Sequence, residues 1–149
     1  GGTLAMNLAY GGNSAIPVRF VFELAAPTYF VAEDWGSLMK SDNLGSEEEF
    51  YRMMTGKELS AQEYRQEIKK ISPTCLVGED SVPTLIGYGL KDHCVPADQK
   101  EYLIDALEKN GVSYDYVEFP HSNHLLYGDL DKMQTFMDLS LEYCKKYFQ

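Results

Sequence analysis

Three short apolar segments, each bounded by glycine or proline, alternate along the chain with stretches of helical periodicity. Residues 18–24, 83–89 and 113–119 are rich in β-branched and aromatic side chains, which is typical of mostly buried strands. Mainly apolar strands that alternate with helices favour a parallel sheet that is covered on both faces. We therefore expect an α/β fold, with a mostly parallel sheet between helices predicted at residues 3–10, 96–111 and 133–148.

The segment from Asp34 to Lys70 has a different, more polar character. Ser46 is followed three residues later by Glu49, and Ser60 is followed in the same way by Glu63. This spacing is the capping-box signature of a helix start, so it predicts two short helices. Because they fall between two strands, residues 34–70 are expected to form a small helical cap insertion rather than a second domain.

The charge and cysteine content narrow the classes of partner. The 149 residues include 13 Lys and Arg against 23 Asp and Glu, which gives a net charge of −10. An acidic surface repels phosphate backbones and anionic lipids, so nucleic acid and membranes are not expected as partners. The three cysteines, Cys75, Cys94 and Cys144, match no metal-binding spacing and no disulfide framework, which favours a reducing compartment, the cytoplasm.

Two loops carry residues suited to nucleophilic catalysis. Asp92 follows the strand at 83–89, and His124 follows the strand at 113–119. Reactive groups in parallel sheets gather where strands end, so these two side chains are expected to meet. A carboxylate fixes the tautomer of the histidine and stabilises its protonated form while the ring takes a proton from a serine. We predict that Asp92 and His124 are the catalytic acid and histidine, within about 3.2 Å of each other.

Each of these residues also has a structural interpretation. An aspartate at a strand end is often a turn or helix-cap residue, and a single loop histidine is often only solvated. His121 is a rival for the histidine role, Asp98 is better explained as an acid near a helix start, and His93 has no partners with metal-ligand spacing. The chain has no glycine-flanked serine between a strand and a helix, which argues against Ser14, Ser72 and Ser122 as nucleophiles.

Both loops resemble those of α/β-hydrolases of the esterase and lipase type. The resemblance extends over nearly the whole chain, and the order of acid then histidine is that of the family. Two positions depart from the common pattern: Tyr88 stands where many relatives have histidine, and Asn123 where many have glycine. The matching stretches are Pro83-Thr84-Leu85-Ile86, Gly89-Leu90-Lys91-Asp92, Val95-Pro96, Gln99, Tyr116-Val117-Glu118-Phe119-Pro120 and Ser122-Asn123-His124.

The start of the chain resembles the end of the family's nucleophile elbow, G-x-S-A-G-G, followed by a helix of small residues. If Gly1-Gly2 is the end of that motif, the nucleophilic serine lies two residues before Gly1. Residues 1–149 would then be the C-terminal portion of one α/β-hydrolase domain. The alternative explanation is that Gly1-Gly2 is the remnant of a tag. We expect the N-terminal half of the same fold, or a symmetry-related copy, as the partner of this chain.

The resemblance implies a serine-dependent hydrolase that acts on a small-molecule carboxylic ester. This chain would supply the acid and the histidine, and by itself it would be inactive. No metal or organic cofactor is implied. One alternative is a peptidase of the same fold, and another is a non-catalytic binding module that has lost the nucleophile. The residue two before Gly1 separates the enzymes from the binding module.

Overall fold

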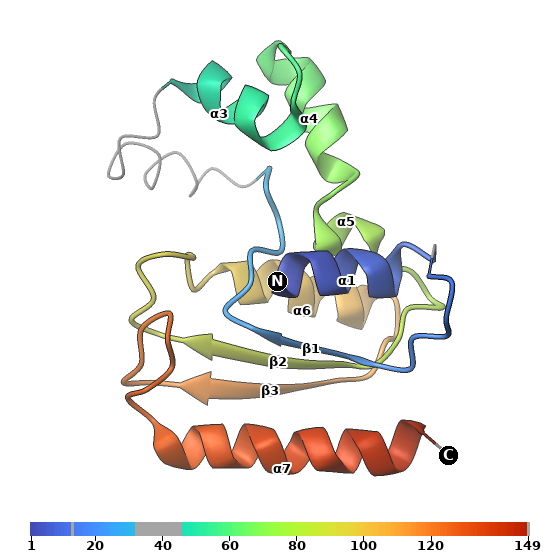
Figure 1. The fold of residues 1–149 in the computed structure, drawn as a ribbon, viewed down its shortest axis with the longest axis vertical. Coiled ribbons are helices and arrows are strands. Elements are labelled where there is room, and N and C mark those ends of the chain that lie inside the picture. The colour runs from blue at the N-terminus through green and yellow to red at the C-terminus, as the bar shows by residue number, and fades with distance from the viewer. Residues whose placement is uncertain (13, 32–45, 149) are drawn as a thin grey trace.

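A computed structural model describes residues 1–12, 14–31 and 46–148 of the chain (Figure 1). At its centre is a sheet of three strands in the order β1-β2-β3, namely Val21–Leu24, Thr84–Gly89 and Tyr114–Phe119. Both strand pairs are parallel, with Val21 opposite Thr84 and Thr84 opposite Tyr114. The predicted α/β class and parallel sheet are confirmed.

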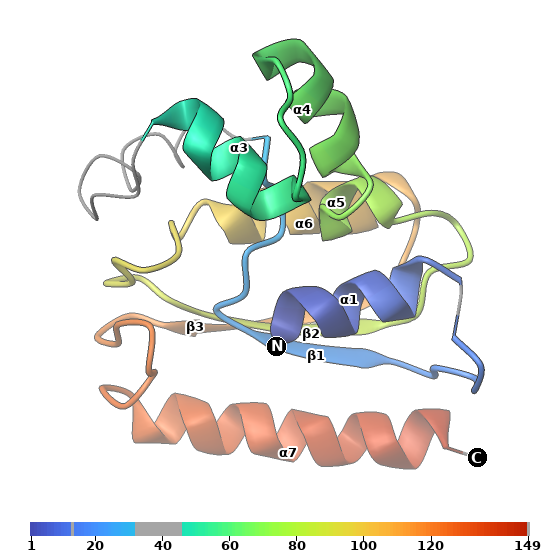
Figure 2. The same ribbon diagram turned by 45° about the horizontal axis from the view of Figure 1, so that its top comes forward.

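Helices cover both faces of this sheet (Figures 1 and 2). Helices α1 (Gly2–Tyr10) and α6 (Gln99–Lys109) lie on one face, together with the short helix α5 (Pro73–Leu76), which the sequence pattern did not predict. Their core is made of fully buried aliphatic and aromatic side chains. It includes Met6, Ile86, Tyr88, Leu103 and Leu107.

The opposite face of the sheet is covered by helix α7 (Leu130–Tyr147). Phe136 and Tyr143 are buried beneath it against Leu85 and Phe119. The sequence pattern also placed Met137 and Leu141 on the apolar face, but their exposed fractions are 53% and 58%. The buried positions recur at spacings of three and four residues, and Met137 and Leu141 lie one position beyond that stripe.

Three predicted boundaries differ from the observed ones by three residues. Helix α7 begins at Leu130 rather than residue 133. Strand β1 begins at Val21 rather than residue 18, and the Val21 amide donates to the carbonyl of Pro83 at 3.0 Å. Proline has no N–H, so it cannot donate the next ladder bond. Helix α6 begins at Gln99 because Pro96 opens a tighter turn, in which the Gln99 amide bonds to the Pro96 carbonyl three residues back.

Helices α3 (Glu47–Thr55) and α4 (Ala61–Lys69) form a separate pair beyond the helix layer of α1, α5 and α6 (Figure 2). Both predicted capping boxes are present, at Ser46 and at Ser60. The pair has its own small core, which also includes residues following β1. Its members are Phe30, Val31, Phe50, Tyr51, Met54, Leu59, Tyr64 and Ile68. The predicted cap also covers residues 34–45, which lie outside the described residues.

Strand β1 forms one edge of the sheet beside helix α1. Leu4 and Leu8, one turn apart on that helix, have exposed fractions of 74% and 51%, and Leu24 at the end of β1 is also exposed. In the part of the chain that the structure describes, no strand pairs with the outer edge of β1. Apolar surface beside such an edge marks a contact surface for another protein segment. Among the described residues, no helix is both long and apolar enough to cross a membrane.

Candidate active site

Asp92 lies in the turn that follows strand β2. Its amide donates to the carbonyl of Gly89 at 3.2 Å, which directs the side chain back under the loop. There Oδ1 accepts the backbone N–H groups of Cys94 at 2.7 Å and Val95 at 2.9 Å. The side chain has no exposed surface, so its position is fixed by the loop that it closes.

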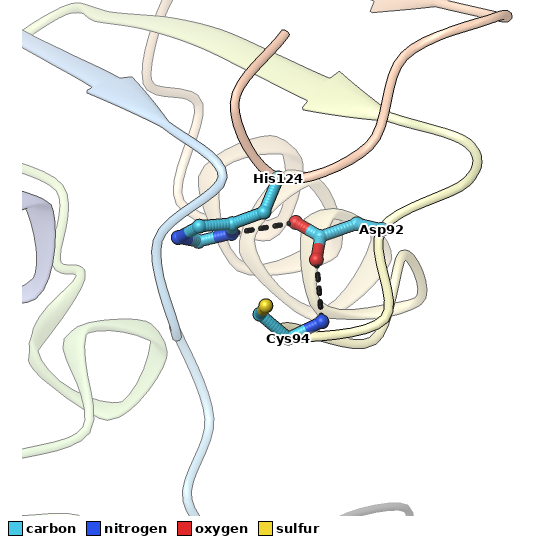
Figure 3. Close-up of side chains that lie close together, drawn as sticks. All are labelled: Asp92, Cys94 and His124. Atoms are coloured by element: carbon cyan, nitrogen blue, oxygen red, sulfur yellow. Dashed lines mark hydrogen bonds and ion pairs between the residues drawn. The ribbon is translucent and has the colours of Figure 1, made fainter.

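His124 lies in the loop that follows strand β3, and its side chain is 39% exposed. Its Nδ1 lies 2.8 Å from Oδ2 of Asp92 (Figure 3), which confirms the predicted hydrogen bond. Because a carboxylate only accepts, Nδ1 carries the proton and Nε2 is left as the basic nitrogen. Figure 3 shows that this second nitrogen faces away from Asp92. The arrangement can take a proton from a nucleophile placed beside His124 and stabilise the resulting charge.

The two loops are also joined through their backbones. The amide of Leu90 donates to the carbonyl of Phe119 at 3.1 Å, and the amide of Lys91 donates to the carbonyl of Ser122 at 3.0 Å. Gly89 makes this close approach possible. A Cβ atom at that position would lie 2.5 Å from the carbonyl oxygen of Ser122 and 2.6 Å from that of Asn123.

A second aspartate holds the histidine loop from its other end. Oδ1 of Asp129 lies 2.7 Å from Nδ1 of His121, and Oδ2 accepts the Ser122 hydroxyl at 2.6 Å and the His121 amide at 2.9 Å. Burial acts to raise the pKa of Asp129, but the hydrogen bonds from Ser122 and His121 outweigh it and lower the pKa. His121 is therefore paired with Asp129, and His124 is the histidine that meets Asp92.

The chain leaving β1 is fixed by two buried side chains. Ala25 has a φ of 51°, a left-handed conformation that is uncommon outside glycine. At the next peptide, Oε2 of Glu23 accepts the Ala26 amide at 3.0 Å, and the Tyr88 hydroxyl donates to the Ala26 carbonyl.

Burial raises the pKa of Glu23 well above its usual value, against the opposing effect of hydrogen bonds from Ala26 and Gly87. Burial and the nearby carboxyls of Glu23 and Asp92 also raise the pKa of Tyr88.

Gln99 connects the same segment to helix α6. Its Oε1 accepts the amides of Thr28 at 2.9 Å and Tyr29 at 2.7 Å, and its carbonyl accepts the Thr28 hydroxyl at 2.6 Å. The residue is fully buried, as are Thr28 and Glu23. These contacts keep the coil after β1 against the start of α6, next to the acid loop.

The other candidates named from the sequence lie elsewhere. His93 is exposed, and Asp98 is the residue before helix α6, where its side chain makes no capping bond. Ser72 donates its hydroxyl to the Ile68 carbonyl. Ser122 donates its hydroxyl to Asp129 rather than to a histidine.

Three residues around the site were not identified from the sequence, namely Glu23, Cys94 and Asp129. An acidic residue within the mainly apolar segment 18–24 was a usable signal for Glu23, because buried carboxyls are rare. Cys94 and Asp129 carry no such signal, since their contacts depend on how the two loops fold together.

The parallel sheet, its helix layers and the carboxylate–histidine pair at the strand ends define the chain as a member of the α/β-hydrolase superfamily. The sequence pattern of the prolyl oligopeptidase family matches residues 10–149. The chain belongs to that family. No curated protein matches it in sequence.

Solved structures share the fold at low sequence identity. A truncated carbohydrate esterase from gut microbiota has a TM-score of 0.70 at 18% identity over 99% of this chain and 57% of its own. An acetyl ester-xyloside bifunctional hydrolase from Caldicellulosiruptor lactoaceticus has a TM-score of 0.63 at 17% identity over 97% and 52%. A propionate-bound thermophilic esterase from Thermogutta terrifontis has a TM-score of 0.61 at 20% identity over 98% and 52%. This chain thus spans slightly more than half the length of these three structures.

Proposed function

We propose that this chain is the C-terminal portion of a serine-dependent carboxylic ester hydrolase. The hydrogen bond between Asp92 and His124 carries the proposal, since it orients the imidazole of His124 with its Nε2 free. The family match and the fold shared with esterases support it. In this proposal the serine lies two residues before Gly1, at the end of the strand that would pair with β1.

The chemistry follows from the orientation of the ring. His124 Nε2 takes the serine proton as the serine oxygen bonds to the acyl carbon of the ester. The ring then gives that proton to the alcohol oxygen as the bond between acyl carbon and alcohol breaks. A water molecule repeats the sequence and releases the acid and the free serine. Asp92 stabilises the charged imidazole in both halves of the cycle.

The exposed surface near β1 supports the assignment of a partner. Leu4, Leu8 and Leu24 are exposed beside the open edge of the sheet. Each buried but unpaired backbone group would cost about 1–3 kcal/mol. We propose that the preceding half of the fold covers this edge, and that a symmetry-related copy is the alternative cover. Helices α3 and α4 would belong to a cap that limits access to the site.

A comparison of the full-length protein with residues 1–149 alone tests this function. The full-length protein should hydrolyse a short-chain p-nitrophenyl ester, and replacing the serine two before Gly1 by alanine should abolish turnover. Residues 1–149 alone should show no turnover. Ester hydrolysis by the 149-residue chain that is lost in His124→Ala would instead place the nucleophile within the chain.

The family match also favours a second candidate, a peptidase of the same fold. Both candidates use Asp92 and His124 in the same roles, so the substrate separates them. An esterase should show a higher kcat/KM for the p-nitrophenyl ester than for a proline-containing peptide p-nitroanilide after correction for their uncatalysed rates. The reverse order would identify a peptidase.

A further inference from the structure

We propose that Asp92, Cys94 and His124 form a binding site for Zn²⁺, and that zinc bound there inhibits the hydrolase. The binding site stands on the geometry of these three residues alone, whereas the inhibition rests on the proposed function. One potential ligand atom from each residue lies within 4.8 Å of the other two. Figure 3 shows Cys94 projecting to the same side of the acid loop as the imidazole of His124.

Asp92 has one coordination position to spare. A carboxylate offers about four lone-pair positions. Oδ1 uses two of them for the amides of Cys94 and Val95, and Oδ2 uses one for His124. The remaining position on Oδ2 can bind a metal without breaking either backbone bond, so zinc would not require the acid loop to unfold.

Cys94 and His124 can complete the ligand set. Cys94 is a free, exposed cysteine, and His124 is 39% exposed, so both are open to solvent. Zinc bonds of about 2.0–2.3 Å place tetrahedral ligands roughly 3.3–3.8 Å apart. The ligand atoms lie within 4.8 Å of one another, which exceeds this range by roughly 1–1.5 Å at most. The distance of 2.8 Å between Asp92 Oδ2 and His124 Nδ1 is shorter than the range. Binding therefore requires exposed Cys94 to rotate inward and the hydrogen-bonded pair to open slightly. On binding, the thiol releases its proton to solvent.

The ligand types select the metal. Thiolate and imidazole ligands favour Zn²⁺, whereas Mg²⁺ and Ca²⁺ prefer sites made of oxygen alone. The net charge of −10 raises the local concentration of any cation near the surface. Three protein ligands leave a fourth position for water or a buffer anion.

Zinc in this position would stop the proposed reaction for a simple reason. Zinc shared with Asp92 bonds to Nδ1 of His124, the ring nitrogen beside that carboxylate. The Nδ1 proton then moves to Nε2, so Nε2 cannot accept the serine proton, and the hydrogen bond between Asp92 and His124 is lost. Removing the metal returns both groups to the arrangement in Figure 3. Inhibition should therefore be reversed by a chelator.

The binding experiment is a titration of the full-length protein with Zn²⁺ in competition with a chromophoric chelator. Cys94→Ala should weaken zinc binding by roughly tenfold or more, since loss of even an indirect metal contact costs that much. Cys75→Ala, which removes another exposed free cysteine, is the matched control and should bind as the unmodified protein does. Co²⁺ should give a thiolate-to-metal absorption band that is absent in Cys94→Ala.

Zinc affinity in Cys94→Ala within twofold of the unmodified protein would overturn the site, as would an equal loss of affinity in Cys75→Ala.

The inhibition experiment compares the rate of each variant with zinc to the rate of the same variant without zinc. Zinc should slow ester turnover in the unmodified protein and much less in Cys94→Ala. Binding through Cys94 with an unchanged rate would overturn inhibition. Binding through Cys94 in a protein that has no hydrolase activity would uphold the site and overturn the proposed function.

Discussion

The amide nitrogen of Lys91 lies 3.0 Å from the carbonyl oxygen of Ser122, and this backbone bond joins the acid loop to the histidine loop. Asp92 is the next residue after Lys91, and His124 lies two residues beyond Ser122. The separation of the two catalytic candidates is therefore set by backbone atoms as well as by their own hydrogen bond. Such a link pre-organises the pair before any substrate binds.

Asp92→Asn and His124→Ala should each reduce kcat in the full-length enzyme with little change in KM. An amide at position 92 favours the wrong tautomer of His124, and loss of the ring removes the base itself. By analogy with other triads the loss should be about 10⁴-fold for Asp92→Asn and about 10⁶-fold for His124→Ala. Steady-state kinetics on the p-nitrophenyl ester measure this effect.

His121→Ala is the matched control for His124→Ala, because it removes a histidine from the same loop that is paired with Asp129 instead. Its kcat should fall by far less than that of His124→Ala. Equal losses in the two variants would contradict the assignment of His124 as the base.

Asp129→Asn should loosen the histidine loop and make the free energy of unfolding less dependent on pH in the acidic range. The pKa of Asp129 in the folded protein is lowered below its ordinary value of 3.8. The ionised carboxylate therefore stabilises the fold above about pH 4, and this contribution is lost as the pH falls through the folded pKa. Denaturant midpoints should be lower in Asp129→Asn than in the unmodified protein near neutral pH. The two midpoints should converge in acid, and a gap that stays constant across this range would exclude the carboxylate as its source.

Glu23→Gln should have the opposite pH signature. The folded pKa of Glu23 is raised well above 4.5, so unfolding releases a proton at pH values between 4.5 and the folded pKa. Its stabilising neutral form is fully present below about pH 4.5, and the associated stability is lost as the pH rises toward the folded pKa. Glutamine keeps an oxygen that can accept the Ala26 amide but does not ionise.

Urea unfolding at about pH 5 and about pH 8 tests this prediction. The free energy of unfolding should fall from the lower to the higher pH in the unmodified protein, and should fall less in Glu23→Gln. Glu63→Gln is a useful comparison, since Glu63 caps an exposed helix start and its pKa is lowered rather than raised. An identical pH dependence in Glu23→Gln and the unmodified protein would show that Glu23 ionises normally.

The sequence predicts those parts of the fold that depend on local pattern. Apolar segments located the three strands, and Ser46 and Ser60 located two helix starts, because capping bonds join residues only three apart. The meeting of Asp92 with His124 was also predictable, since the ends of neighbouring parallel strands share one edge of a sheet.

Contacts between segments distant in the sequence were not predictable. Gln99 binds Thr28 and Tyr29 across about 70 positions, and no spacing rule relates them. Cys94 lies two residues from Asp92, but its closeness to His124 depends on how two loops close on each other. The contacts of Asp129 arise in the same way, because the end of the histidine loop folds back onto His121 near its beginning.

Gly89→Ala should separate the acid and histidine loops. The added Cβ would meet the carbonyl oxygens of Ser122 and Asn123 at 2.5 and 2.6 Å, and backbone atoms cannot move aside as a side chain can. We expect a stability loss of about 1–3 kcal/mol, which is typical of overpacking, and a fall in kcat of at least about tenfold, as a misplacement near 1 Å produces. Gly78→Ala is the matched control, since a Cβ there meets nothing within 4 Å and the backbone has no positive φ. Thermal unfolding and ester kinetics on both variants measure the two effects. If Gly89→Ala retained full turnover at an unchanged melting temperature, the close packing of the two loops would not be what positions His124 against Asp92.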